Sequence, residues 1–147
     1  MPGKGRTEAG RWFHQARHDL RAAAWNLEGG FHNTVCFLAQ QSAEKALKSL
    51  LYYVGSRKQA LMTHSLVGMV SDQADAIEGL SDLLEEARTL DMHYIPSRYP
   101  NGLPDGIPHR FYSAKLAKEA LACAQKIQDF AAGFYEARGE NDFLETG

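Results

Sequence analysis

Apolar residues between positions 35 and 54 recur at steps of three and four, the spacing that places side chains on one face of an α-helix. A helix of about 20 residues is about 30 Å long, which is roughly the width of a small domain. We therefore predict that a helix over about residues 31–54 lies at the centre of an all-α bundle. Its apolar face comprises Val35, Leu38, Ala39, Ala43, Ala46, Leu47, Leu50, Leu51 and Val54.

The opposite side of this predicted helix carries Gln41, Glu44, Lys45 and Lys48. One interpretation is a solvated face, on which Glu44 and Lys48 form an i,i+4 ion pair worth about 0.2–0.5 kcal/mol. The other is a polar groove for an anion, because lysine provides a mobile charge with three hydrogen-bond donors. The pattern by itself is compatible with both.

The same spacing predicts three more long helices, over about residues 8–28, 78–93 and 113–137. Residues 55–63 are expected to form a loop, and a short helix is expected to follow it. Thr7 and Ser113 are expected N-caps of long helices, and Thr63 or Ser65 of the short helix. Glycines at 29–30 and 55 are expected to end the first two helices. The fold class is an up-and-down helical bundle of four long helices plus one short helix.

The length of 147 residues fits one domain with its own core. We assign residues 8–137 to the bundle, and expect residues 1–7 to form a disordered N-terminus and residues 138–147 a disordered tail. No apolar run is long enough to cross a membrane, and no signal-peptide pattern opens the chain, so a cytoplasmic location is expected. Cys36 and Cys123 lie within apolar helical patterns and are expected to be reduced.

Four of the five prolines lie between Tyr94 and Tyr112, at positions 96, 100, 104 and 108. Proline at this spacing is incompatible with a continuous helix, so we predict a long loop before the last helix. Loops of this length in compact domains are often functional. An ordered strap over the end of the bundle is the alternative interpretation.

Charge is distributed unevenly along the chain, although the net charge is only −2. Residues 1–60 contain nine Lys and Arg against four Asp and Glu. One line of the first helix carries Arg11, His14, His18 and Arg21. This line is either a solvated basic face or a strip that meets phosphate or an acidic partner. The sequence has no CxxC or HExxH motif, so neither a metal nor a cofactor is expected.

Three segments together resemble the HEPN domain family. They are FLAQQSAEKALKSLL in the central helix, the His64-Ser-Leu that follows, and above all YIPSRYP at positions 94–100. The resemblance covers about residues 8–137. It implies an α-helical bundle that commonly pairs as a homodimer and is often encoded beside a minimal nucleotidyltransferase.

The resemblance also implies a nucleotide site, for a ligand of the ATP or GTP class. In this interpretation Lys45, Lys48 and Arg98 contact phosphate, and Tyr94 or Tyr99 stacks on a base. Gln41 and His64 complete the set of motif positions.

A ribonuclease branch of the same family, found among toxins and in phage defence, is characterised by an Arg followed by a His after four to six residues. The chain has three such pairs, Arg11/His18, Arg57/His64 and Arg88/His93. Arg88 and His93 are the candidates we retain, because they lie beside the proline-rich loop. A metal-independent endoribonuclease acting on RNA is therefore the first alternative function, and a protein-interaction module without catalysis is the second.

Overall fold

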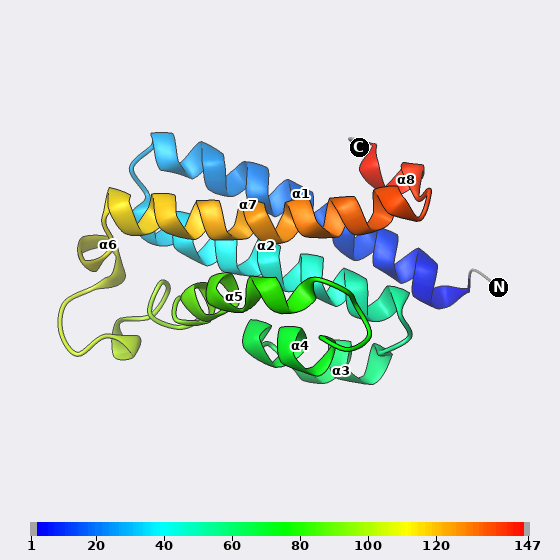
Figure 1. Cartoon of the computed structure of the whole chain (residues 1–147). Coiled ribbons are helices and arrows are strands. Elements are labelled where there is room, and N and C mark those ends of the chain that lie inside the picture. The colour runs from blue at the N-terminus through cyan, green and yellow to red at the C-terminus, as the bar shows by residue number, and fades with distance from the viewer. Residues whose placement is uncertain (1–2, 146–147) are drawn as a thin grey trace.

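The computed structural model describes residues 3–145, and none of them is in a β-strand. Three long helices run side by side (Figure 1): α1 (Lys4–Glu28), α2 (His32–Tyr53) and α7 (Ala114–Ala137). The shorter elements are α3 (Arg57–Met62), α4 (Leu66–Asp72), η1 (Leu80–Leu83), α5 (Leu84–Asp91), η2 (Pro100–Gly102), α6 (Pro108–Phe111) and α8 (Asn141–Leu144). The predicted all-α helical bundle is confirmed.

Helix α2 is the centre of the bundle. It packs most extensively against α1 and α7, and α3, α4 and α5 cover its remaining side. Most of its predicted apolar positions are fully buried, including Val35, Leu47 and Leu50. Leu38 is partly buried, and Val54 has 36% of its surface exposed because it lies beyond the last residue of the helix.

Local capping signals were largely predicted correctly. Ser65 Oγ accepts a hydrogen bond from Gly68 N (3.0 Å), and Ser113 Oγ accepts one from Leu116 N (3.2 Å). Helix α1 ends at Glu28, and Gly30 has the positive φ of 77° that glycine adopts without strain. The predicted cap at Thr7 was wrong, because α1 already begins at Lys4.

Two further predictions differ from the structure. Residues 57–62 form α3 rather than a loop, and only Ala60 of this short helix is buried, so it has no apolar periodicity to detect. The predicted helix over 78–93 is divided into η1 and α5. Gly79 precedes η1, and its φ of 83° is incompatible with the α-helix predicted to pass through this position.

The described residues near the two chain ends contact each other, in segments for which the sequence predicts disorder. Arg6 makes two hydrogen bonds to the Glu140 carboxylate, at 2.7 and 3.0 Å. Phe143 of α8 is buried and lies 4.8 Å from the Tyr135 ring, measured between centroids. The Arg6–Glu140 pair joins positions 134 residues apart, so no local pattern predicts it. The outermost residues 1–2 and 146–147 lie outside the described part of the chain.

Candidate functional site

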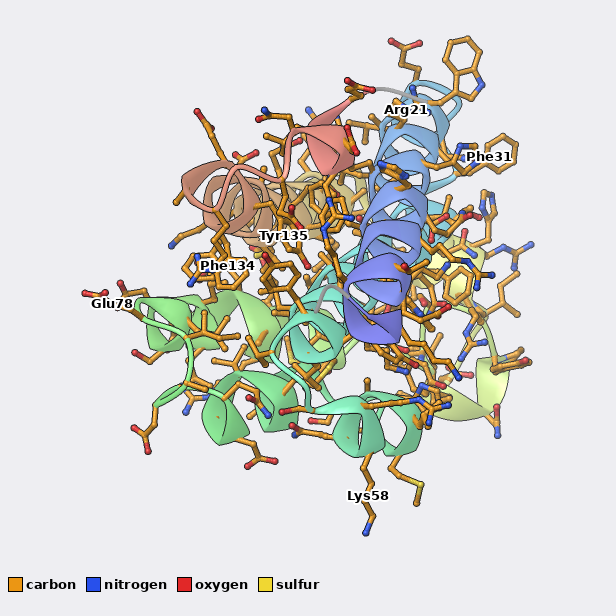
Figure 2. The ribbon with its side chains drawn as sticks, turned by 90° about the vertical axis from the view of Figure 1, so that its right-hand side faces the viewer. Arg21, Phe31, Lys58, Glu78, Phe134 and Tyr135 are labelled. Carbon is orange, nitrogen blue, oxygen red and sulfur yellow. The ribbon has the colours of Figure 1, made fainter. Side chains whose placement is uncertain are left out.

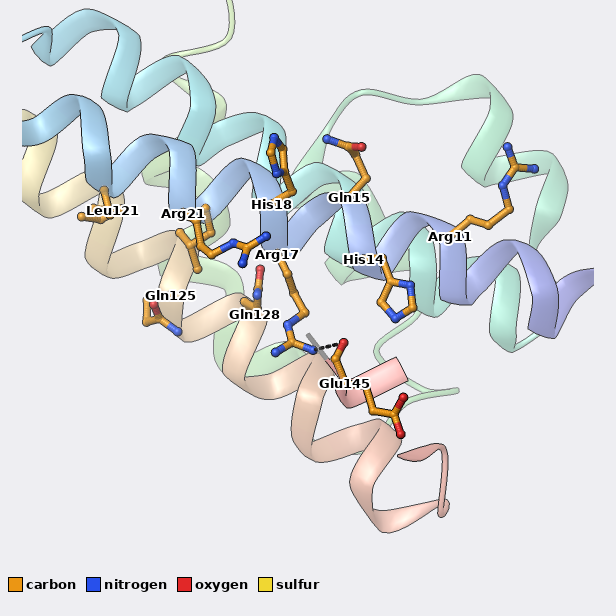
Figure 3. A pocket seen from close by; sticks show the side chains of 12 residues that line it. Arg11, His14, Gln15, Arg17, His18, Arg21, Leu121, Gln125, Gln128 and Glu145 are labelled. Carbon is orange, nitrogen blue, oxygen red and sulfur yellow. Dashed lines mark hydrogen bonds between the residues drawn. The ribbon is translucent and has the colours of Figure 1, made fainter. Parts of the chain in front are cut away.

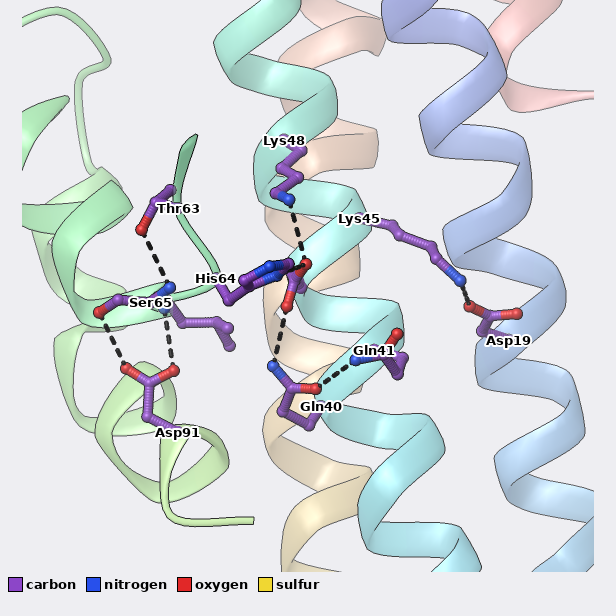
Figure 4. A network of polar contacts seen from close by, with 11 residues as sticks. Asp19, Gln40, Gln41, Lys45, Lys48, Thr63, His64, Ser65 and Asp91 are labelled. Atoms are coloured by element: carbon purple, nitrogen blue, oxygen red, sulfur yellow. Dashed lines mark hydrogen bonds and ion pairs between the residues drawn. The ribbon is translucent and has the colours of Figure 1, made fainter. Parts of the chain in front are cut away.

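The Glu44 carboxylate, on α2, is the centre of a polar network (Figure 4). It accepts hydrogen bonds from Gln40 Nε2 and His64 Nδ1 and pairs with Lys48 Nζ, each at 3.1 Å. Glu44 and Lys48 are only 6% and 5% exposed. The solvated-face interpretation of this side of α2 was therefore wrong. The network is covered because the His64 segment lies over it and the Trp12 ring lies 5.5 Å from Lys48 Nζ.

Lys45 and Gln41 are held on the α1 side of the same helix. Lys45 forms an ion pair with Asp19 of α1, whose other carboxylate oxygen accepts from Gln15 Nε2 at 2.8 Å. Gln41 Nε2 donates to the side-chain oxygen of Gln40 at 2.7 Å. Both lysines of the predicted phosphate site thus already have carboxylate partners. Sequence reasoning missed Asp19, because a pairing between helices leaves no local signal.

The proline-rich loop contributes a stack of aromatic and cationic groups. The Tyr94 ring stacks on His64 with a centroid distance of 5.5 Å and an interplanar angle of 19°. The Arg98 guanidinium lies 4.6 Å from the Phe37 ring centroid and 5.0 Å from those of Tyr94 and Tyr99. Its Nε and Nη2 donate to the Tyr94 carbonyl at 3.0 and 2.9 Å. The guanidinium is thereby fixed over the rings at one end of α2.

Short-range contacts fix the segment that carries this stack. Ser97 Oγ donates to the His93 carbonyl at 2.5 Å, and Asn33 Nδ2 of α2 donates to the Ser97 carbonyl at 3.1 Å. Gly102 lies so close to Pro96 that an added Cβ would be 2.9 Å from Pro96 Cα. The strap interpretation and the functional interpretation of the loop are therefore compatible, because the strap itself holds Tyr94 and Arg98 in place.

His64 is positioned by the start of α4. The Asp91 carboxylate accepts from the backbone N–H groups of Leu66 (2.9 Å) and Val67 (3.0 Å), which anchors the residues just after His64. An acidic side chain at a helix start satisfies backbone donors that would otherwise lack partners. The His64 side chain remains 62% exposed while its Nδ1 contacts Glu44. Asp91 was a second positioning residue that the sequence did not reveal.

The structure thus brings most of the predicted site residues into one band. This band, which we call the His64–Arg98 cluster, comprises Gln41, Lys45, Lys48, His64, Tyr94, Arg98 and Tyr99, together with their partners Asp19, Phe37 and Glu44. Tyr99 is 50% exposed, and it borders the band on the side of the proline-rich loop. Exposed aromatic faces beside fixed cations are suited to binding a planar anionic ligand.

The two residues of the ribonuclease alternative have different environments. Arg88 is exposed and pairs with Glu85 at 3.2 Å on the same helix. His93 is 6% exposed, and its Nδ1 lies 2.9 Å from the Tyr112 hydroxyl. A general base must reach the proton that it removes, and this imidazole is enclosed by protein in the described chain.

Burial of His93 gives a testable dependence of stability on pH. Desolvation lowers the pKa of His93 below its ordinary value of 6.5, although Glu119 opposes the effect. The unfolded chain therefore binds a proton more readily, so the free energy of unfolding falls as the pH drops below about 6.5. Urea unfolding at pH values on either side of 6.5 measures this change. Between the higher and the lower pH, the free energy of unfolding should fall less in His93→Gln than in the wild type. An equal loss in the two proteins would contradict this assignment.

Residues 3–145 contain no group of three or more His, Cys, Asp or Glu side chains placed to hold a metal ion. Within the same range, none of the helices has the length and apolarity needed to cross a lipid bilayer. Cys36 and Cys123 are both free thiols, as predicted. The groups of the cluster take part in hydrogen bonding, ion pairing and stacking.

Solved structures with similar folds match this chain over nearly the whole length of their own chains. TT1696 from Thermus thermophilus is 42% identical, with a TM-score of 0.76, and the match covers 85% of this chain and 96% of that one. ST0689, an archaeal HEPN homologue, is 35% identical with a TM-score of 0.70, covering 85% and 95%. A HEPN domain protein from Thermotoga maritima, TM0613, is 28% identical with a TM-score of 0.67, covering 86% and 98%.

A longer relative carries a similar segment. Human sacsin is 27% identical over 122 residues, which are 82% of this chain but only 3% of sacsin. The model of the HEPN domain family matches residues 9–134. The matched range includes most of α1, all of α2 and the whole His64–Arg98 cluster. This chain belongs to the HEPN domain family.

Proposed function

We propose that this chain binds a nucleotide at the His64–Arg98 cluster. The observation that carries the proposal is the Arg98 guanidinium, which is held over the rings of Phe37, Tyr94 and the exposed Tyr99. A base would stack on the exposed face of His64 or Tyr99, and a phosphate would accept hydrogen bonds from the guanidinium. Because Nε and Nη2 of Arg98 already bond to Tyr94, Nη1 is the group that we assign to the phosphate.

The roles of the lysines follow from their ion pairs. Lys45 and Lys48 are neutralised by Asp19 and Glu44, so a phosphate would have to compete with these carboxylates. Lys45, with a side chain 25% exposed, is the more accessible of the two. We therefore rank Arg98 first among the phosphate ligands, Lys45 second, and Lys48 as a residue that positions Glu44 and His64.

Partner proteins belong to the same proposal. Members of the family that this chain resembles in sequence commonly pair as homodimers and are often encoded beside a minimal nucleotidyltransferase. Both associations stay predictions for this chain. The placement of Arg88 and His93 supports nucleotide binding over RNA cleavage, because His93 is buried against Tyr112.

Thermal unfolding in the presence of ATP, GTP or AMP tests the nucleotide site. A ligand at about 100 times its dissociation constant stabilises the folded state by about 2.7 kcal/mol, which raises the midpoint by several degrees. Arg98→Ala should abolish this shift. Arg88→Ala removes an exposed arginine outside the cluster and should keep it.

Two results would contradict the proposal. One is the absence of a shift with all three nucleotides, and the other is a shift that survives Arg98→Ala. RNA cleavage that persists in EDTA and disappears in His93→Ala would instead support the endoribonuclease.

A further inference from the structure

A groove lies between α1 and α7 (Figure 3). Its volume is about 730 Å³. Asp19, which belongs to the cluster, does not line it. The groove contains five basic side chains, all on α1: Arg11, His14, Arg17, His18 and Arg21.

The basic side chains of the groove have few acidic neighbours. Arg11 pairs with Glu8 at the end of the groove. Within residues 3–145, no carboxylate lies within ion-pairing distance of His18 or Arg21. The facing wall on α7 carries the neutral Leu121, Gln125 and Gln128.

The C-terminal segment closes one end of the groove without neutralising it. Glu145 is the one acidic residue among the described groove residues. Arg17 contacts backbone rather than carboxylate oxygens there, donating to the carbonyls of Phe143 (3.2 Å) and Glu145 (3.4 Å). Figure 3 shows the Glu145 carboxylate turned away from Arg17. The centre of the groove therefore keeps its positive charge, although the whole chain has a net charge of −2.

An exposed tryptophan continues the basic line. Positions 11, 14, 18, 21 and 25 follow each other at steps of three and four, so Trp25 lies one helical turn beyond Arg21 on the same side of α1. Its surface is 76% exposed, whereas tryptophan is highly buried on average. The line from Arg11 to Trp25 is about 21 Å long at 1.5 Å per residue.

We propose that the α1/α7 groove and Trp25 bind single-stranded nucleic acid. A positively charged groove that follows the phosphates, with an aromatic ring on which a base stacks, is the combination that binds single strands without sequence preference. A length of about 21 Å accommodates roughly six stacked nucleotides at about 3.4 Å each. The Gln15 and Gln125 amide nitrogens donate to Asp19 and Asp129, so their side-chain oxygens are the groups that can accept from base edges.

An acidic peptide would satisfy the basic groove equally well, but it would give no role to an exposed indole face beside amide groups. Stacking on Trp25 is therefore the contact that distinguishes a nucleic-acid strand. The groove shares no residue with the His64–Arg98 cluster, although Gln15 at its edge donates to Asp19 of the cluster.

Fluorescence anisotropy of a labelled uridine oligonucleotide of about 12 nucleotides tests the proposal. Arg21→Gln and Trp25→Ala change exposed side chains, so both variants should fold. We expect each to weaken binding roughly tenfold, as loss of one phosphate contact or one stacked base does. Between about 50 and 200 mM salt, Arg21→Gln should also reduce the slope of log affinity against log salt by about one.

Lys58→Gln provides the matched control. It removes the same charge from an exposed position of α3, and Figure 2 shows Lys58 and Arg21 on opposite sides of the molecule. This variant should bind the oligonucleotide as the wild type does. Quenching of Trp25 fluorescence in a Trp12→Phe background would report the stacking directly.

Several outcomes would overturn the proposal. They are no rise in anisotropy at low salt, equal weakening by Lys58→Gln, and binding that Trp25→Ala leaves unchanged. Competition by an oligoglutamate peptide as strong as that by unlabelled oligonucleotide would assign the groove to an acidic protein segment instead. Loss of oligonucleotide binding in Arg21→Gln with an unchanged thermal shift by ATP would show that the two sites are separate.

Discussion

Replacing Glu44 with alanine is expected to lower the free energy of unfolding by about 3–5 kcal/mol, the cost of leaving a buried charge without its partner. Lys48, only 5% exposed, would keep its ammonium group in the protein interior while losing the carboxylate 3.1 Å away. Gln40 and His64 would lose an acceptor at the same time. Urea unfolding, extrapolated to water, measures the change.

Two controls separate burial from charge. Glu85→Ala removes a carboxylate from an exposed ion pair with Arg88 on the same helix. We expect it to lower the free energy of unfolding by less than about 1 kcal/mol. Glu44→Gln combined with Lys48→Met removes both charges while keeping an acceptor for Gln40, and it should recover most of the lost stability. A Glu44→Ala protein no less stable than Glu85→Ala would mean that water replaces the carboxylate at Lys48.

Replacing Tyr135 with alanine is expected to cost about 3–5 kcal/mol, the range for removing a large aromatic side chain from a core. The Tyr135 side chain, which is labelled in Figure 2, is fully buried. Four rings surround it at centroid distances of 4.8–5.3 Å, and they belong to Phe13, Tyr53, Phe134 and Phe143. Because Phe143 anchors α8, the substitution should also release the C-terminal segment.

The Tyr135 hydroxyl makes a separate contribution. It lies 2.6 Å from Ser49 Oγ, which itself donates to the Ala9 carbonyl at 2.6 Å. Tyr135→Phe keeps the ring and removes this one hydrogen bond, so we expect a loss of about 0.5–1.5 kcal/mol. Guanidinium unfolding of both variants provides the comparison. Equal losses in the two would show that the hydrogen bond, and not the packing of rings, stabilises this end of the bundle.

The candidate site was only partly predictable. His64, Tyr94 and Arg98 were selected from a resemblance in sequence motifs, and the structure places them in one stack although 30 residues separate His64 from Tyr94. The state of the lysines was not predictable. Whether Lys45 and Lys48 are solvated or paired depends on Asp19 and on the segments that cover α2, and these lie in other elements.

The sequence by itself determined the helical class, the approximate bounds of α1, α2 and α7, and the cap at Ser113, and it left Thr63 and Ser65 as the two candidates for the cap of α4. These follow from periodicity and capping, which are properties of a few neighbouring residues. Only the tertiary structure decided that the polar side of α2 is buried, that His93 is enclosed, and that the chain ends are joined through Arg6 and Glu140. Burial and pairing depend on which distant segments cover a given face, and the pattern of one helix does not contain that information.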